Sequence, residues 1–201
     1  MPLPGIYERT LFSGFQMRFP SRYIPAPHPK AEIRPTREAI ERALASGWVG
    51  QMKVHGHRAQ VHLHADASVP PIVFTRQGVP HKIDLTPEIA AELRRILPLK
   101  DGWSVVDGEW IKPKKQFYLF DCLKKDGEDL AALTYPQRYA LLPRNFISPH
   151  VTLLPLLPTL EKCLATLAMD SDHVEGLVFK SLNSPGFSDT SILRCRKRPG
   201  L

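Results

Sequence analysis

Lys53, Gly56 and Arg58, within the hexapeptide KVHGHR, are the residues whose types and spacing best suit covalent chemistry. A lysine amine is a poor nucleophile while it is protonated, so nearby cations, a metal or desolvation must lower its pKa. Arg58 supplies one such charge, and Gly56 lets the backbone turn and approach a phosphate closely. The peptide therefore predicts that Lys53 attacks a nucleotide phosphate, although a surface hairpin turn explains this peptide alone equally well.

Two carboxylates and an aromatic residue follow at positions expected to lie on separate strands. Glu109 lies in VVDGEW and Glu175 in VEGLVFK, and such a pair can hold Mg²⁺ or its waters beside a triphosphate, with Mn²⁺ as a second choice. Each glutamate alone also fits a solvated strand end. Phe120 in YLFDCL can stack on a base, although Tyr118 and Leu119 beside it also suit a buried core strand.

Four basic residues complete the candidate site. Arg76, Lys180, Arg194 and Arg196 have the charge needed to clamp phosphates, while any one of them alone fits a solvated surface. The two arginines of ILRCRK suit electrostatic binding better than acid catalysis, because a guanidinium does not readily release a proton.

These motifs, in this order, resemble the nucleotidyltransferase domain of ATP-dependent polynucleotide ligases over roughly residues 34–198. The same superfamily includes RNA ligases and mRNA capping guanylyltransferases. Its first motif is a lysine, any residue, aspartate, glycine, any residue and arginine. Lys53, Gly56 and Arg58 match it, and His55 stands where most DNA ligases have aspartate and some RNA ligases have histidine.

The resemblance implies a role for each matched residue. Lys53 is the catalytic residue that becomes adenylated, Glu109 and Glu175 are acids of the third and fourth motifs and metal ligands, and Phe120 stacks on the purine. Gln51 stands where DNA ligases place an acid that reads the adenine amino group. The full set assigned to the cofactor is Gln51, Met52, Arg58, Arg76, Glu109, Phe120, Glu175, Lys180, Arg194 and Arg196.

The fifth motif departs from the family pattern. The family usually has lysine, any residue, lysine, where this chain has Arg194, Cys195 and Arg196; Lys197 can substitute if the register slips by one. A family arginine expected shortly before is missing, with Ser188 nearby. Only ten residues separate Glu109 from Phe120, so the connecting loop is short.

The function implied by the resemblance is an ATP- and Mg²⁺-dependent ligase that seals 5′-phosphate/3′-hydroxyl breaks through a lysyl-AMP intermediate. Nicked duplex DNA is the first choice of substrate because of Arg58, and RNA or an RNA-containing duplex is next because of His55. A capping guanylyltransferase and a non-catalytic nucleic-acid-binding module remain as further alternatives. No OB-fold domain is expected in the chain, which fits a minimal ligase or a domain cut at its boundary.

Composition fits one enzyme domain with a polyanionic partner. The chain has 201 residues and a formal net charge of +7. The excess gathers in two clusters, at Lys112, Lys114 and Lys115 and at Arg194, Arg196, Lys197 and Arg198. Cys122, Cys163 and Cys195 are scattered and suit free thiols. With no apolar run near the ~20 residues of a membrane span, an intracellular monomer is expected, cytoplasmic or nucleoid-associated and not bound to membranes.

The expected elements place these motifs in an α+β domain with antiparallel sheets flanked by helices. Residues 1–35 are proline-rich and predict an irregular arm packed on a nucleotidyltransferase domain formed by residues 36–201. Helices are predicted at 36–45, 86–97, 135–142 and 160–168. Strands are predicted at 49–53, 58–64, 103–111, 116–123, 174–181 and 192–196, with a hairpin of 72–75 and 81–84.

Histidines at positions 55, 57, 62 and 64 form two HxH pairs, which raises the possibility of zinc binding. The pairs have no cysteine or carboxylate partner at ligand spacing. We therefore favour the interpretation that these histidines alternate along a half-exposed strand and are solvated.

Overall fold

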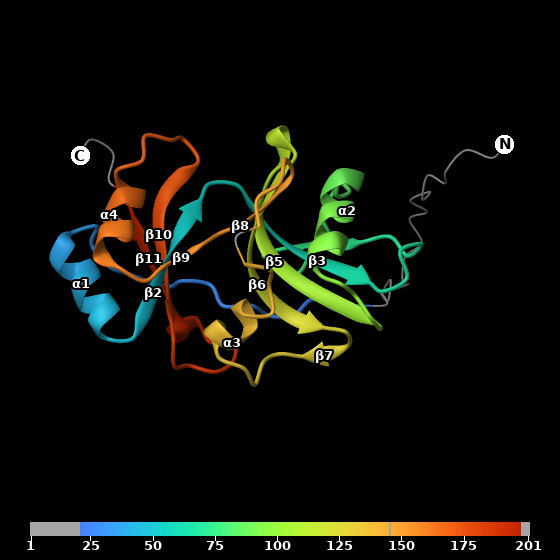
Figure 1. The fold of residues 1–201 in the computed structure, drawn as a ribbon, viewed down its shortest axis with the longest axis horizontal. Helices are drawn as coiled ribbons and strands as arrows, with labels where there is room; N and C mark the ends of the chain where they lie inside the picture. Colours follow the sequence, from blue (N-terminus) through green and yellow to red (C-terminus); the bar gives the residue numbers. More distant parts are fainter. Residues whose placement is uncertain (1–20, 145, 198–201) are drawn as a thin grey trace, which may run out of the picture.

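The computed structural model describes residues 21–144 and 146–197, which form two β-sheets with helices packed on them (Figure 1). The first 20 residues of the expected arm and Arg198 of the C-terminal basic cluster lie outside this range. Nine strand pairings join the described strands, and all are antiparallel except β1 with β11 and β6 with β8. The α+β class and the mainly antiparallel sheets are as predicted.

The first sheet carries Lys53 and has the strand order β1-β11-β10-β2-β9. Helices α1 (Arg37–Ala45) and α4 (Leu160–Leu167) pack on it. Buried Ile40 and Cys163 of these helices meet Leu177, Phe179 and Cys195 of the sheet. Its strands are β1 (Ala31–Glu32), β2 (Trp48–Val54), β9 (Leu156–Leu157), β10 (Val174–Ser181) and β11 (Ile192–Arg196).

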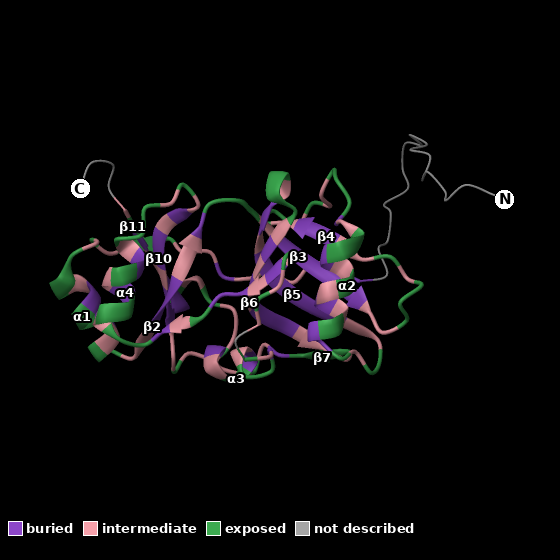
Figure 2. Cartoon of the chain, turned by 45° about the horizontal axis from the view of Figure 1, so that its top comes forward, coloured by how far each residue is buried: buried purple, intermediate pink, exposed green. Residues whose placement is uncertain are grey.

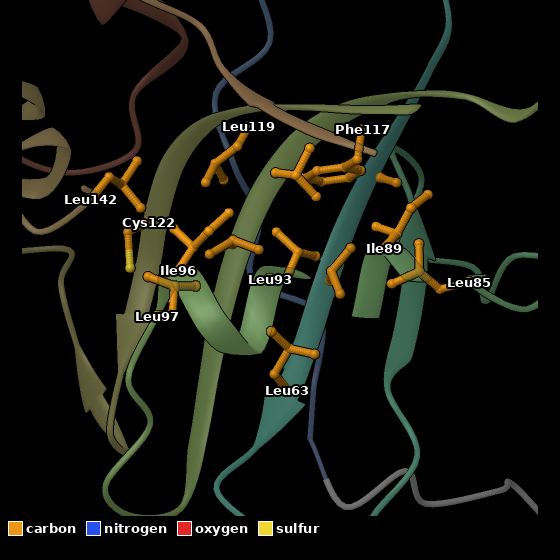
Figure 3. Packing of buried hydrophobic residues seen from close by; sticks show 14 of the residues in the cluster. Leu63, Leu85, Ile89, Leu93, Ile96, Leu97, Phe117, Leu119, Cys122 and Leu142 are labelled. Atoms are coloured by element: carbon orange, nitrogen blue, oxygen red, sulfur yellow. The ribbon is translucent and has the colours of Figure 1, made fainter. Parts of the chain in front are cut away.

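The second sheet has the order β4-β3-β5-β6-β7, with β8 beside β6. Helix α2 (Pro87–Ile96) covers it and inserts Ile89, Leu93 and Ile96 among Phe117 and Leu119 (Figure 3). This core fixes the strands that carry Glu109 and Phe120. The strands are β3 (His57–His64), β4 (Ile72–Thr75), β5 (Trp103–Ile111), β6 (Gln116–Lys125), β7 (Glu128–Asp129) and β8 (Val151–Leu153).

The chain passes from one sheet to the other within the KVHGHR peptide. Strand β2 pairs with β10 and β9, whereas β3 pairs with β4 and β5. The two predicted strands on either side of Gly56 therefore exist, but they do not form a hairpin with each other. A second passage lies between β8 and β9, where Leu154 and Pro155 separate a strand of the second sheet from a strand of the first.

Three threonines begin the longer helices, as their sequences indicate. Thr36 accepts a hydrogen bond from the Ala39 backbone, and Thr86, followed by Pro87 in the first turn, accepts one from Ile89. Thr159 caps α4 in the same way. Figure 2 shows the result: the strands are mostly buried, while the outer turns of α1, α2 and α4 are exposed.

One predicted strand is absent, one predicted helix is shorter than expected, and several short strands were missed. No strand forms at 81–84: the return of the chain from β4 ends at a single bridge between Phe74 and Pro80, and Ile83 is 56% exposed, so this segment has no buried face. The helix predicted at 135–142 forms but is shorter, as α3 (Tyr135–Tyr139). Strands β1, β7, β8 and β9 were not predicted.

Two short 3₁₀ helices complete the described elements: η1 (Lys112–Lys114), which carries two lysines of the first basic cluster, and η2 (Asp189–Ser191). No helix in the described part of the chain combines the length and apolar character that crossing a membrane requires.

Candidate functional site

A cavity of about 470 Å³ lies between the two sheets, where both passages of the chain meet. This volume is within the range typical of small-molecule sites. Nine of the eleven residues proposed from the sequence line it: Gln51, Met52, Lys53, Arg58, Arg76, Glu109, Phe120, Glu175 and Lys180. The fold thus brings together residues that are more than 120 positions apart, such as Lys53 and Glu175.

Lys53 and Glu175 meet because of an irregularity in the first sheet. Val54 pairs with Val174 and Lys53 with Gly176, so Glu175 is an extra residue in β10, which is a β-bulge. Bulges redirect side chains and are common beside active sites. Gly176 has φ of 143°, and a Cβ there would lie 2.1 Å from the Cys195 carbonyl oxygen. Only glycine fits this bulge without a shift of the neighbouring strand.

The Glu175 carboxylate accepts hydrogen bonds from Lys53 Nζ and His55 Nδ1. Burial alone raises the pKa of Glu175, but these hydrogen bonds outweigh it and the pKa is lowered. His55 therefore occupies one carboxylate oxygen of the site, and it is largely exposed, with 68% of its side-chain surface accessible.

Glu109 lies opposite Arg58 in the β3–β5 ladder and faces the same cavity. Burial raises the pKa of Glu109 to about 7, although the charge of Lys53 opposes the shift. Gly56 is needed here for space: a Cβ would lie 3.0 Å from Glu109 Cγ and 3.0 Å from the Trp110 carbonyl oxygen. Close packing between the sheets, and not left-handed backbone geometry, explains this glycine.

Arg58 is paired with a carboxylate and is not the unpaired cation that the sequence led us to expect. Its Nε and Nη2 atoms donate to the Asp107 carboxylate, with the shortest bond at 2.5 Å, and its Nη1 donates to the Pro27 carbonyl oxygen at 2.6 Å. Burial opposes its charge, yet Asp107 more than offsets this and the pKa of Arg58 is raised. Asp107 thus neutralises much of the charge that Arg58 brings to the cavity.

A buried hydrogen-bond network forms one end of the cavity. The Gln51 side-chain amide donates to the Leu154 carbonyl oxygen at 2.8 Å and accepts from the Tyr135 hydroxyl at 3.1 Å. The same hydroxyl proton is shared with the Phe120 carbonyl oxygen, which lies 2.9 Å from the hydroxyl oxygen. Gln51, which is only 2% exposed, is therefore held in one orientation.

Lys180 is buried in this end of the cavity between two aromatic rings. Its Nζ lies 4.0 Å from the Tyr135 ring centroid and 4.5 Å from that of Phe120. Burial lowers the pKa of Lys180 to about 8, and the charge of Asp121 limits the shift. Arg138 of α3 in turn binds Asp121 through two hydrogen bonds of 3.0 Å. We call the buried residues Gln51, Asp121, Tyr135, Arg138 and Lys180 the floor of the cavity.

Phe120 is placed by a second bulge. Asp107 pairs with Asp121 and Gly108 with Leu119, so Phe120 is the extra residue of β6. The Phe120 ring lies on the cavity between the guanidinium of Arg58, at 5.8 Å, and the ammonium of Lys180. This half-buried ring lines the cavity.

Arg194 and Arg196 do not line the cavity. Both donate hydrogen bonds to Glu32 of β1, the neighbouring strand of β11. Lys197 donates to the Met169 carbonyl oxygen. The assignment of these two arginines to the cofactor therefore remains a prediction that the cavity itself does not support.

Several cavity-lining residues were not predicted from the sequence. Tyr135, Asp121 and Arg138 belong to the floor, and His28 comes from the N-terminal arm. Asp121 directly follows Phe120 in the motif YLFDCL, which was the one available signal for it. Nothing local marks the others, because they reach the cavity only through the tertiary fold.

Glu109 and Glu175 could hold Mg²⁺ or Mn²⁺. Among the described residues no three histidine, cysteine or acidic side chains gather in a way that could hold a metal ion, so the four histidines considered for zinc form no such group there. Two carboxylates suit Mg²⁺, which commonly keeps waters and takes further ligands from substrate phosphates. Both carboxylates line the cavity.

Two sheets that enclose a lysine-bearing cavity define the class: the fold is that of the nucleotidyltransferase domain of the polynucleotide ligase superfamily. More specifically, residues 46–195 match the family model described as RNA ligase, and the chain belongs to that family. No protein of curated function resembles the sequence closely enough to count as a match.

Solved structures share the fold at low sequence identity. A mycobacterial DNA ligase D complexed with ATP and MES has a TM-score of 0.59 and 20% identity, covering 85% of this chain and 60% of that one. The ligase domain of LigD from M. tuberculosis has a TM-score of 0.55 and 19% identity, covering 76% of this chain and 55% of that one. The chain thus spans less than two thirds of either relative.

Proposed function

We propose that this protein is an ATP-dependent polynucleotide ligase that works through a lysyl-AMP intermediate. The observation that carries the proposal is the position of Lys53, whose amine faces a cavity of nucleotide size beside Glu175 and within reach of the charge of Glu109. Membership of the RNA ligase family supports the same activity.

In the first step, Lys53 Nζ attacks the α-phosphorus of ATP, a phosphorus–nitrogen bond forms and pyrophosphate leaves. An oxygen of a 5′-phosphate then attacks the AMP phosphorus and releases the lysine amine. A 3′-hydroxyl finally attacks the activated 5′-phosphate, which joins the strands and releases AMP. Before the first step the amine must separate from Glu175 and give up a proton.

Different cavity residues bind different parts of the nucleotide. Phe120 stacks on the purine, Met52 packs beside it and Gln51 presents its amide to the base edge, while Lys180 adds positive charge nearby. Arg76, which is exposed beside the cavity, contacts phosphate. Glu109 and Glu175 would hold Mg²⁺, which would offset negative charge on the phosphates when bound.

For the joined strand we favour RNA or an RNA-containing duplex over nicked duplex DNA, the first choice from the sequence. His55 matches the residue of some RNA ligases, and the family match points the same way. The 2′-hydroxyl is the group by which such a site can distinguish the two.

The test is incubation of the protein and Mg²⁺ with α-labelled ATP or GTP, followed by a denaturing gel and mass spectrometry. A lysine-linked AMP adduct from ATP is expected, and it should be consumed on addition of a nicked duplex with RNA at the break. Label from GTP alone would identify a capping-type guanylyltransferase and reject the ligase. Absence of any adduct, with retained nucleic-acid binding, would leave a non-catalytic binding module.

Strand choice is tested with matched nicks that differ only in the sugars at the break. Faster sealing of the RNA-containing nicks is expected. Equal or faster sealing of all-DNA nicks would reverse our choice of strand without affecting the proposed chemistry.

A further inference from the structure

The segment of residues 21–32, which we call the strap, crosses from the second sheet to the first over the cavity. At its start, Ile24 exchanges two backbone hydrogen bonds with the Gln60 side chain, of 2.8 and 2.9 Å, and Ser21 Oγ lies 2.7 Å from His62 Nδ1. At its end, β1 pairs with β11 of the first sheet. The strap therefore joins both walls of the site.

The middle of the strap lines the cavity with Pro27, His28 and Pro29. The His28 backbone N–H donates to Asp189 Oδ1 at 2.9 Å, and the Pro27 carbonyl oxygen accepts from Arg58 at 2.6 Å. The prolines restrict φ, so the strap loses little conformational entropy when it is ordered. His28 is consequently held between a loop of the first sheet and an arginine of the second.

The His28 ring also contacts Arg76. Arg76 Nη1 and His28 Nε2 are 3.3 Å apart, and a guanidinium can only donate, so Nε2 must be the acceptor. His28 is then neutral and carries its proton on Nδ1. Burial lowers the pKa of His28, and the charges of Arg76 and Arg58 lower it further, which agrees with a neutral ring.

The strap holds the Arg76 backbone as well. The Tyr23 hydroxyl donates to the Arg76 carbonyl oxygen at 2.9 Å, and the Tyr23 ring lies so close to Gly78 that a Cβ there would be 2.8 Å from it. Gly78 has φ of 74° in the turn that follows β4. Both the backbone and the side chain of Arg76 are thus fixed by residues of the strap.

We propose that His28 is a positioning residue that orients the Arg76 guanidinium toward a phosphate of the substrate. This inference rests on the proposed function. A guanidinium has five N–H donors, and the contact with His28 uses one, which leaves others to bind phosphate oxygens in a fixed orientation. Arg76 is otherwise an exposed, long side chain that would lose rotamer freedom on binding. The phosphate belongs either to ATP or to the 5′-end of the strand.

The experiment measures binding in the full-length protein, by calorimetry, of α,β-methylene-ATP and of a 5′-phosphorylated nicked duplex. His28→Ala is expected to weaken one of these ligands about tenfold, as for loss of a hydrogen bond to a charged group. His28→Gln should restore most of the affinity, because its Oε1 can replace Nε2 as acceptor. Lys30→Ala, which removes only an exposed ion pair between the strap and Asp189, should change affinity less than twofold.

The decisive variant is Arg76→Ala, alone and combined with His28→Ala. If His28 acts through Arg76, the double variant binds no more weakly than Arg76→Ala alone. Additive losses, or unchanged affinity for both ligands in His28→Ala, would overturn the proposal. Unfolding midpoints of the four proteins separate these results from a folding defect.

Weaker binding of either ligand supports the inference. Which of the two binds more weakly identifies the phosphate that Arg76 contacts. The proposed function is judged separately, from AMP adduct formation by the wild-type protein. A wild-type protein that forms adduct and a His28→Ala variant that binds normally would reject the role of His28 alone.

Discussion

The floor of the cavity and its rim contain similar charged side chains, but these side chains differ in burial and in how fully they are hydrogen-bonded. We define the rim as His28, Lys53, His55, Arg76 and Glu175. In the floor, Arg138 is 2% exposed and makes two hydrogen bonds to Asp121, and Gln51 is held on both sides of its amide. In the rim, Lys53 is 24% exposed in its side chain and His55 is 68% exposed.

This difference separates stability from chemistry. Buried polar groups with complete hydrogen bonding are rigid, and removing one partner leaves a costly unpaired group. Rim groups are close to water and can exchange partners, which a nucleophile must do when its amine leaves Glu175 for a phosphate. We therefore expect floor substitutions to change the free energy of unfolding and rim substitutions to change activity with little effect on folding.

The largest expected effect is in the rim, on replacement of Lys53. Both Lys53→Ala and Lys53→Arg should lose the AMP adduct completely, because neither has the primary amine. Lys53→Arg keeps the ion pair with Glu175 and is the matched control for charge. Both variants should unfold within about 1 kcal/mol of the wild type, because the side chains of the pair are 24% and 28% exposed and water weakens their interaction. Gel assays with labelled ATP and urea unfolding measure the two quantities; adduct formation by either variant would reject Lys53 as nucleophile.

The next largest effect is expected in the floor, where replacing Arg138 should change the free energy of unfolding because Arg138 pairs with Asp121. Arg138→Met leaves a buried carboxylate without its partner and should lower the free energy of unfolding by about 3–5 kcal/mol. Adding Asp121→Asn in the same chain should recover part of the loss, because the unpaired charge is removed. Urea unfolding provides the measurement. A loss below about 1 kcal/mol for Arg138→Met would remove the distinction between floor and rim.

The sequence was sufficient to predict the fold class and those cavity-lining candidate residues that lie in local motifs. The KVHGHR and VEGLVFK peptides located Lys53 and Glu175, because each motif contains its own strand. The positions of the candidate residues within the two sheets could not be predicted in the same way. The bulge at Glu175 depends on the register between β2 and β10, which are distant in sequence, and the bulge at Phe120 depends on the register between the consecutive strands β5 and β6. No short pattern in a single sequence encodes either register.

The floor and the strap are harder still to predict, because their contacts are non-local. Tyr135 reaches Gln51 across 84 positions, and Glu32 reaches Arg194 and Arg196 across more than 160. Their place in the fifth motif and their charge assigned those two arginines to the phosphates. Nothing near them in the sequence shows that a glutamate from the arm would bind them. The hairpin expected at 81–84 failed for a local reason, as Lys82 and Asp84 are exposed.

Glu109 belongs neither to the floor nor to the rim as defined here. Its contribution to stability should depend on pH in the opposite direction to that of Glu175. The pKa of Glu109 is raised from 4.5 to about 7, so its contribution to stability is full below pH 4.5 and is lost as pH rises through about 7. Glu109→Gln should remove this loss and gain about 2 kcal/mol relative to wild type between pH 5 and 8, at about 1.4 kcal/mol per pKa unit.

Glu175→Gln is the matched control, with the opposite sign. The lowered pKa of Glu175 means that its contribution is present at neutral pH and is lost as pH falls. Unfolding curves at several pH values measure both variants. Parallel pH profiles for Glu109→Gln and Glu175→Gln would contradict the two assigned environments.

The smallest effect concerns the Tyr135 hydroxyl, which connects floor stability to choice of base. Tyr135→Phe removes the donor to the Gln51 amide oxygen and should cost about 1 kcal/mol of unfolding free energy. The amide can then turn and present its donors or its oxygen to the base, so preference for ATP over GTP in adduct formation should fall several-fold. Tyr118→Phe is the control: its hydroxyl donates to the Gln116 side chain at 2.9 Å, and neither residue lines the cavity. Equal loss of base preference in both variants would show that the orientation of Gln51 does not set the selectivity.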